Sequence, residues 1–156
     1  MKNRMIAKEG KRVLVFGVFD LFHKGHKSFL KQAKKYGGEL VVLVARDSVV
    51  KQLKGKRPHQ NEKARLAVVS GQISVAKAML GDKIQGSYAV LRKIKPNVIC
   101  FGYDQQQLKN DLREKMHENI IATAYRVTLR AHQSHLYKTS KIYRKLRKGN
   151  RNHKYK

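Results

Sequence analysis

Two histidines and an aspartate interrupt an apolar stretch near the N-terminus, in the sequence GVFDLFHKGH. His23 and His26 are three residues apart, Gly25 lies between them, and Asp20 precedes His23 by three residues. Gly25 has no side chain, so a ligand can approach the backbone closely. His26 stands where a helix is expected to begin, and the free N–H groups and dipole of a helix start favour an anion. With His23 aiming a second N–H at that anion, the stretch predicts a phosphate cradle that binds more tightly as charge builds in a transition state.

Other phosphate and metal motifs fit this stretch poorly. A dinucleotide-binding turn needs G-x-G-x-x-G, but only Gly17 and Gly25 are available. The dipeptide Lys27-Ser28 lacks the G-x-x-x-x-G spacing of a P-loop. No His-x-x-x-His or cysteine pair accompanies the cradle, and the two histidines of HQSH (132–135) have no further ligands, so we expect no metal-ligating residues. The remaining alternative is a pair of incidental surface histidines at a turn.

An alternation of strands and helices surrounds the cradle. Short apolar runs predict strands over 12–17, 39–45, 74–80, 97–102 and 119–129. The segments between and after them predict helices over 27–36, 61–72, 86–95, 105–116 and 139–148, with Asn61 as a possible N-cap. Strands that are apolar throughout and separated by helices indicate a parallel sheet covered on both faces. The predicted fold class is therefore α/β, with a three-layer, Rossmann-like, five-stranded parallel sheet.

The loops that follow four of these strands carry most of the polar chemistry of the chain. In an open parallel sheet, ligands bind at the carboxyl ends of the strands, near the point where the strand order reverses. The loops at this edge hold the cradle and the stretches RDSVVKQLKGKRPHQ, YDQQQ and RAHQSHLYKTS, whereas GDKIQG after the third strand is comparatively poor. Four loops that supply complementary groups at one edge argue against incidental histidines.

The net charge is the most unusual feature of the composition, because 36 Lys and Arg against 10 Asp and Glu give +26. Such a surface attracts polyanions, and RNA affinity is a second hypothesis, although no RNP-type aromatic motif or zinc-finger spacing is present. The 156 residues fit one domain over 1–148, followed by a basic tail over 149–156 that we expect to be disordered. Cys100 is the single cysteine, which indicates a buried strand residue in a reducing, cytoplasmic setting. The longest apolar run, LVVLVA (40–45), is too short to span a bilayer.

Three motifs resemble those of one family. GVFDLFHKGH resembles the G-x-F-D-x-x-H-x-G-H signature of the cytidylyltransferase-like (HxGH) nucleotidyltransferases. TSKI (139–142) is similar to their C-terminal I-S-[ST]-[ST]-x-I element, with Tyr137 and Lys138 in place of the usual Ile-Ser, and Glu62 and Arg65 match their E-x-x-R. The stretches RDSVVKQLKGKRP and FGYDQ make the chain most similar to the small archaeal-type FAD synthases, over nearly its whole length.

The resemblance implies the HxGH nucleotidyltransferase fold, with strand order 3-2-1-4-5, and a set of site residues. The expected catalytic residues are His23, His26, Lys54 and Lys56. The expected nucleotide-binding residues are Val18, Phe19, Asp20, Gly25, Asp104, Arg130, Thr139 and Ser140, and the expected substrate-binding residues are Asp20, Arg57 and Arg65. In these roles the histidines contact the α-phosphate, the hydroxyls hold the β- and γ-phosphates, and the residues of KGKRP form a mobile clamp on the anions.

Three of these residues keep an alternative role. Asp20 can bind the ligand or orient the loop, or it can cap the turn. Asp104 can contact the base or ribose, or it can be the N-cap of the helix over 105–116. Arg130 can face the triphosphate or be one more surface cation.

The activity that the resemblance implies is transfer of AMP from ATP to FMN with release of pyrophosphate. The attacking phosphate monoester has a second pKa near about 6 and is already ionised, so we expect no catalytic base. Mg²⁺ is expected to arrive on the triphosphate, because it keeps several waters and takes few protein ligands. The alternatives are a CTP-dependent enzyme such as a glycerol-3-phosphate cytidylyltransferase, whose usual Trp and GDDW-like loop are absent, and a basic nucleic-acid-binding protein. The sequence leaves the choice of ATP or CTP, the acceptor and a possible homodimer open.

Overall fold

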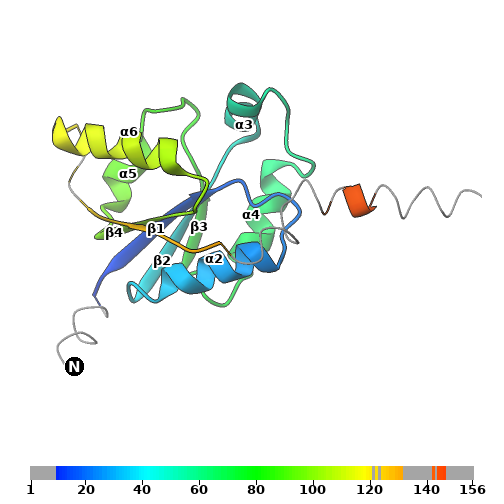
Figure 1. Ribbon diagram of the computed structural model, residues 1–156, viewed down its shortest axis with the longest axis horizontal. Coiled ribbons are helices and arrows are strands. Elements are labelled where there is room, and N and C mark those ends of the chain that lie inside the picture. The colour runs from blue at the N-terminus through cyan, green and yellow to red at the C-terminus, as the bar shows by residue number, and fades with distance from the viewer. Residues whose placement is uncertain (1–9, 121, 123, 132–141, 143, 147–156) are drawn as a thin grey trace, which may run out of the picture.

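The structure, a computed structural model, describes residues 10–120, 122, 124–131, 142 and 144–146. Its sheet consists of β1 (Arg12–Gly17), β2 (Glu39–Val44), β3 (Lys77–Leu80), β4 (Val98–Phe101) and β5 (Tyr125–Thr128). Every neighbouring pair of strands is parallel, and their order is β3-β2-β1-β4-β5 (Figure 1). The predicted fold class and strand order are therefore confirmed.

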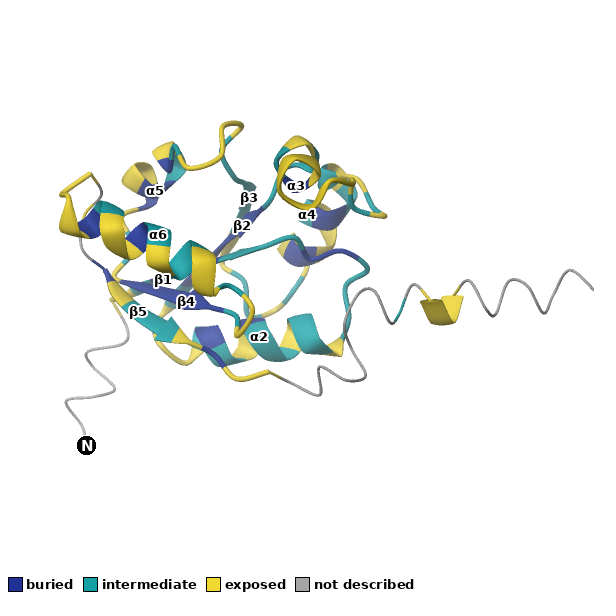
Figure 2. Ribbon diagram, turned by 45° about the horizontal axis from the view of Figure 1, so that its top comes forward, coloured by how far each residue is buried: buried dark blue, intermediate teal, exposed yellow. Residues whose placement is uncertain are grey.

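Helices cover both faces of the sheet, which makes three layers (Figure 1). They are α2 (Lys24–Lys34) and α4 (Glu62–Ser70) on one face, and α5 (Ala89–Ile94) and α6 (Gln106–His117) on the other. The alternation of side chains along β1 supplies both cores: Val13 and Val15 belong to the α2/α4 side and Leu14 to the α5/α6 side, all fully buried. The buried strand residues lie in β1, β2 and β4, whereas the edge strands β3 and β5 contain none. Figure 2 shows further buried residues on the inner sides of these helices. Burial on both faces explains why the sequences of the three central strands are almost entirely apolar.

The structure corrects the prediction that residues 46–60 form a loop. This segment contains a fifth helix, α3 (Asp47–Lys54), which buries Val50 and ends at Gly55 in the left-handed conformation, with φ of 74°. A glycine at that position is favoured because a Cβ disfavours a positive φ.

Several predicted boundaries also move. The helix predicted over 27–36 begins at Lys24, because His23 serves as its N-cap. Asn61 is confirmed as an N-cap, since its side chain accepts a hydrogen bond of 2.8 Å from the N–H of Ala64. The first strand has the predicted bounds, 12–17, and the helix predicted over 105–116 is shifted by one residue to Gln106–His117. The remaining strands and helices keep their places but are shorter than predicted at one or both ends. Of the helix predicted over 139–148, residues 142 and 144–146 are described and are helical; the tail 149–156 lies outside the described residues.

Strand β1 lies at the point where the strand order reverses, because it pairs with β2 on one side and with β4 on the other. The segment that follows Gly17 therefore leaves the sheet at the place where open α/β sheets bind ligands. Cys100 on β4 is fully buried, as predicted. No helix among the described residues is long and apolar enough to cross a membrane.

Candidate active site

The two histidines of the cradle cap the start of α2 for each other. The N–H of Gly25 donates to Nδ1 of His23 at 3.1 Å, and the N–H of His23 donates to Nδ1 of His26 at 3.3 Å. These bonds satisfy two of the backbone donors that a helix start leaves without partners. Because both Nδ1 atoms act as acceptors, each ring carries its proton on Nε2.

Burial keeps both imidazoles neutral. It lowers the pKa of His26 to about 3, with the neighbouring His23 adding to the decrease and the Asp20 carboxylate opposing it. Burial also lowers the pKa of His23. The two rings stack with centroids 3.8 Å apart, and the ring of Phe19 meets His26 edge-on at 5.4 Å. Near pH 7 the two rings are therefore neutral and not cationic, and each offers its Nε2–H as a hydrogen-bond donor.

The backbone before the histidines is strained. Phe19 and Leu21, on either side of Asp20, have φ of 55° and 47°, a region that residues with a Cβ rarely adopt. Such residues cost about 1–3 kcal/mol each and persist only where the surroundings hold them. At Gly17 a Cβ would lie 2.6 Å from the ring of Phe19, so the close packing of this ring over the strand end requires glycine.

Asp20 holds the segment between α3 and α4 against the cradle. It is only 6% exposed, and its carboxylate accepts hydrogen bonds from the N–H groups of His59 at 2.8 Å and Gln60 at 3.0 Å. The Nδ1 atom of His59 lies 2.7 Å from the same carboxylate. Burial raises the pKa of Asp20, but these hydrogen bonds and the charge of His59 outweigh it, so the pKa lies below its usual value. The geometry matches the loop-orienting alternative predicted for Asp20.

Arg65 lies in the interior of the protein rather than on the surface. Its side chain is 0% exposed, and its guanidinium donates to the carbonyls of Val18 at 2.7 Å and Gln60 at 3.0 Å and to Asp47 Oδ1 at 2.7 Å. These contacts join the cradle, the start of α3 and the segment before α4. These contacts show what holds the buried guanidinium in place, and the predicted contact between Arg65 and substrate stays a prediction.

At the end of β4, a glutamine occupies the switch point. The side-chain amide of Gln105 donates to the carbonyl of Phe16 at 3.0 Å and accepts from the N–H of Gly102 at 2.8 Å, so it joins the ends of β1 and β4. Asp104 is exposed, and the N-cap position of α6 belongs to Gln105. The N-cap alternative for Asp104 is therefore wrong, and its contact with the nucleotide stays a prediction.

The predicted cations of the site are exposed. Lys54 ends α3, and Lys56 and Arg57 follow it on the segment that Asp20 anchors. Arg130 follows β5 and is also exposed; its backbone N–H and carbonyl bond the side chain of Gln32 on α2 at 3.2 and 3.1 Å. The two hydroxyls predicted to hold the triphosphate, Thr139 and Ser140, lie outside the described residues.

Sequence reasoning missed the residues that join these loops. They are Asp47, His59, Gln60 and Gln105. Their only signal in the sequence is their position in polar loops at the ligand-binding edge. Among residues 10–120 and the other described positions, no three His, Cys, Asp or Glu side chains lie close enough together to hold a metal ion.

The fold and the paired histidines at its switch point define this chain as a nucleotidyltransferase. A family model described as cytidylyltransferase-like matches residues 14–145, and the chain belongs to this family.

Several relatives support this assignment. An FAD synthase of Thermococcus sibiricus is 38% identical over 146 residues, which are 91% of this chain and 96% of that protein. An FAD synthase of Methanohalophilus mahii is 34% identical over 86% of this chain and 93% of that protein. A crystal structure described as the lipopolysaccharide core biosynthesis protein from Thermoplasma volcanium has a TM-score of 0.72 at 38% identity, covering 79% of this chain and 98% of that one.

A more distant structure shows the fold alone. It is a pantoate-beta-alanine ligase from Francisella tularensis complexed with beta-gamma ATP and beta-alanine, with a TM-score of 0.55 at 14% identity. It covers 92% of this chain and 69% of that one.

Proposed function

We propose that this protein transfers AMP from ATP to FMN, forming FAD and releasing pyrophosphate. The observation that carries the proposal is the neutral histidine pair at the start of α2, in a chain whose relatives of similar length are named FAD synthase. The names of these relatives favour ATP and FMN over the alternative of CTP and glycerol-3-phosphate. We place the reaction in the cytoplasm, in keeping with the buried thiol of Cys100.

The reaction needs positioned donors more than a base. An ionised phosphate oxygen of FMN attacks the α-phosphorus of ATP, a new P–O bond forms, and the bond to the bridging oxygen breaks as pyrophosphate leaves with the electron pair. The Nε2–H groups of His23 and His26 donate to the α-phosphate oxygens, where negative charge grows. Neither ring can take a proton on Nε2, because that nitrogen already carries one. The histidines therefore stabilise the transferring group and do not act as general bases.

The other predicted residues complete the site. Lys54, Lys56 and Arg57 neutralise the mutually repelling phosphates, and Asp20 and Arg65 position the loops that carry them. The remaining predicted contacts to the nucleotide come from Val18, Phe19, Gly25, Asp104, Arg130, Thr139 and Ser140. Mg²⁺ bound to the triphosphate would supply charge neutralisation there; the three hydrogen bonds already accepted by Asp20 fit a loop anchor better than a metal ligand.

A crossed panel tests the proposal. Pyrophosphate release is measured with ATP or CTP against FMN, glycerol-3-phosphate and phosphoethanolamine, with Mg²⁺ present throughout. We expect release with ATP and FMN, together with FAD as the second product. Release only with CTP and an alcohol phosphate would replace the proposed substrates, and no release with any pair would contradict nucleotidyl transfer.

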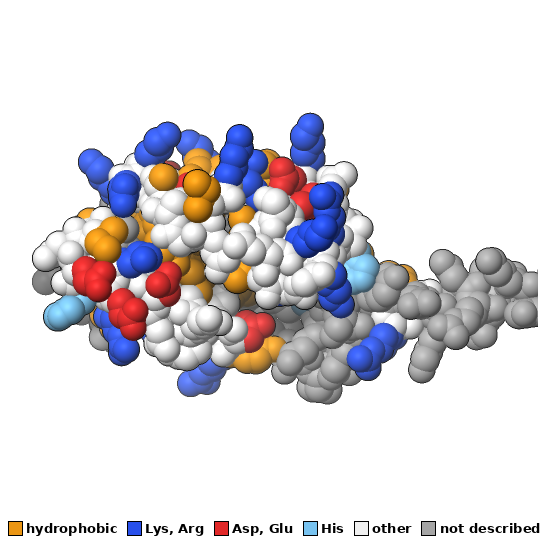
Figure 3. Space-filling view, turned by 90° about the horizontal axis from the view of Figure 1, so that it is seen from above, with side chains coloured by type: hydrophobic (Ala, Val, Ile, Leu, Met, Phe, Trp, Pro, Cys, Tyr) orange, Lys and Arg blue, Asp and Glu red, His pale blue; other side chains and the backbone are white. Residues whose placement is uncertain are grey.

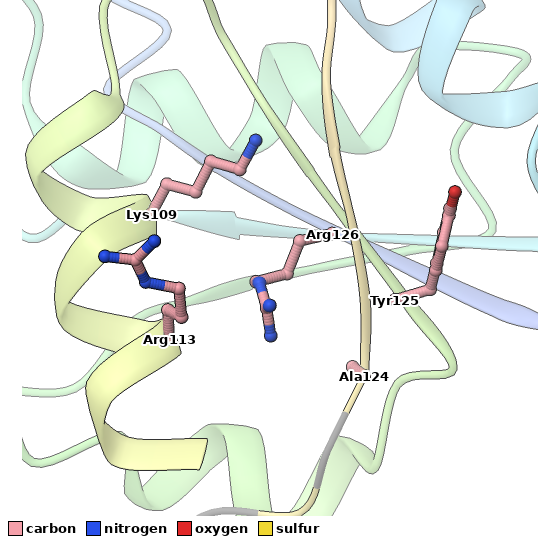
Figure 4. A pocket seen from close by; sticks show the side chains of 5 residues that line it. All are labelled: Lys109, Arg113, Ala124, Tyr125 and Arg126. Atoms are coloured by element: carbon pink, nitrogen blue, oxygen red, sulfur yellow. The ribbon is translucent and has the colours of Figure 1, made fainter. Parts of the chain in front are cut away.

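A secondary affinity for polyanions is supported by a hollow on the opposite side of β4 from the cradle. Lys109, Arg113, Ala124, Tyr125 and Arg126 line this hollow of about 470 Å³ between α6 and β5, with both α6 cations on one side of it and Tyr125 pointing away across the strand (Figure 4). Among the described residues, no carboxylate lies within 4.0 Å of its three cationic groups. Figure 3 shows that other Lys and Arg side chains are spread widely over one face of the molecule.

The test measures binding of a poly(U) oligonucleotide at increasing salt. Non-specific binding should weaken steeply with salt, because it depends on counterion release. The double change Lys109→Gln/Arg113→Gln should weaken binding more than the equal charge change Arg92→Gln/Lys93→Gln on α5. Equal losses from the two double variants would show that the hollow has no special part in the affinity.

A further inference from the structure

The segment from the end of α3 to the start of α4 carries the cations of the site and is fixed mainly at one end. Its cationic part, residues 54–57, is exposed throughout. It leaves α3 through Gly55, which has a left-handed backbone; among the described residues, none beyond its chain neighbours has an atom within 4 Å of the place a Cβ would occupy. Among the described residues, little around the outgoing half therefore holds its position. The fixed end is the return half, at His59 and Gln60.

Four contacts fix this return half to the phosphate cradle. Asp20 Oδ2 accepts from the N–H of His59 and lies 2.7 Å from its Nδ1, and Asp20 Oδ1 accepts from the N–H of Gln60. In the other direction, the N–H of Leu21 donates to Oε1 of Gln60 at 3.2 Å. Two consecutive residues of the cradle loop thus bind two consecutive residues of the segment.

Of the contacts in this anchor, the one made by the side chain of residue 59 depends on that residue being a histidine. Any residue at position 59 supplies a backbone N–H, but the ring adds a donor: an ionised carboxylate only accepts, so Nδ1 carries the hydrogen. The carboxylate that receives it is nearly buried, with an Asp20 side chain 8% exposed, whereas the His59 side chain is 29% exposed. If a buried carboxylate loses a hydrogen-bond donor, the free energy that it lost on leaving water is no longer compensated, and the folded state is destabilised.

The anchor also sets the position of the cations. Only Pro58, whose ring fixes φ, separates His59 from Arg57. Two residues of chain span at most about 7 Å, so the Cα of Arg57 stays within that distance of the anchored residue. The same aspartate belongs to the loop that leads into His23, so one carboxylate connects the histidine donors to the exposed cations.

We propose that His59 is a positioning residue for nucleotidyl transfer: through Asp20 it holds the cationic segment 54–57 in register with the histidine cradle. In this role, His59 does not contact the reacting phosphates. It fixes where Lys56 and Arg57 stand before the substrates bind, so that less reorganisation is needed when charge develops. The kinetic part of this proposal rests on the proposed function, while the structural part does not.

The first experiment compares three single variants in FAD formation. His59→Leu removes the ring donor, His59→Asn retains an N–H close to the position of Nδ1, and His117→Leu on α6 is a matched control far from the cradle. We expect His59→Leu to lower kcat/KM by about 10- to 100-fold, the scale of a small misplacement of catalytic groups. His59→Asn should recover activity to within a few fold of the wild type, and His117→Leu should leave it unchanged. Full activity of His59→Leu would overturn the proposal.

A coupling experiment separates positioning from general loss of structure. If His59 acts through the cations, adding His59→Leu to Lys56→Gln/Arg57→Gln should lower kcat/KM far less than His59→Leu does alone. Fully additive losses would mean that His59 acts by another route and would overturn the proposal.

Hydrogen exchange tests the anchor without any use of activity. In His59→Leu, the peptide covering residues 55–61 should exchange faster by about 10-fold or more, while the peptide covering 106–117 on α6 should not change. Unchanged exchange over 55–61 would overturn the anchor. If the wild type forms no FAD but this peptide still responds to His59→Leu, the proposed function fails and the anchor stands.

Discussion

Replacing the buried Arg65 by methionine is the sharpest stability test of this site. The change keeps a long, unbranched side chain but removes three hydrogen bonds of 2.7–3.0 Å, one of which is also the ion pair with Asp47. Removing one partner of a buried ion pair costs about 3–5 kcal/mol, because the other charge and its neighbours lose their compensation. With a urea dependence of about 2 kcal/mol per M, the midpoint of unfolding should fall by about 2 M.

The assay is equilibrium urea unfolding, with Arg57→Met as the control. Arg57 is exposed, so its replacement should change the free energy of unfolding by less than about 0.5 kcal/mol while lowering activity. If Arg65→Met does not fold, Asp47→Asn gives the same test at a smaller cost of about 1–3 kcal/mol, because asparagine still offers an acceptor. The reasoning is refuted if Arg65→Met leaves the midpoint unchanged and raises KM for FMN, since Arg65 would then be the substrate contact that the sequence predicts.

Three further predictions concern stability and reactivity. The pKa of His26 falls to about 3 on folding, so below about pH 6.5 the unfolded state binds more protons than the folded state. The free energy of unfolding should therefore decrease by up to about 1.4 kcal/mol per pH unit as the pH falls towards 4. Urea midpoints at pH 7, 6 and 5 check this, and His26→Asn should flatten the slope; Asp20, whose pKa lies below its usual value, adds to the loss only at lower pH. Burial raises the pKa of Cys100 to about 12, so a disulfide reagent at pH 8 should modify it in urea but not in the native protein; rapid native modification would contradict the burial. Gly17→Ala should destabilise by about 1–3 kcal/mol through contact with Phe19, whereas Gly71→Ala, with 3.6 Å of room, should be nearly neutral in the same urea assay.

The sheet and the cradle could be predicted because each leaves a local signal. Strands buried on both faces are apolar at consecutive positions, and LVVLVA reads as such a strand without knowledge of its neighbours. The order of the strands came from the resemblance, since apolar runs alone do not specify pairing. The histidines follow the first strand directly, so the rule for open sheets places them at the ligand-binding edge.

The roles of Arg65 and His59 could not be predicted, because burial of a polar side chain depends on tertiary contacts. In a chain with 36 Lys and Arg, one further arginine in a polar stretch has the pattern of a surface cation. Its acceptors, Val18, Gln60 and Asp47, come from three segments that only folding brings together. Helix α3 was missed for a related reason: it is eight residues long, buries one valine and lies in a stretch whose charges are typical of a loop.

In the proposed mechanism, His26 acts in transfer through Nε2–H while its Nδ1 caps α2. The most direct measurement is kcat for FAD formation in His26→Gln against His26→Asn. The glutamine amide reaches the position of Nε2, whereas the asparagine amide oxygen takes the place of Nδ1 as a capping acceptor. We expect His26→Asn to retain more stability but to lose about 10²–10³-fold in kcat, the scale of losing one donor to a developing charge. We expect His26→Gln to have a kcat at least 10-fold higher than that of His26→Asn. Equal rates, or a faster asparagine variant, would contradict donation from Nε2.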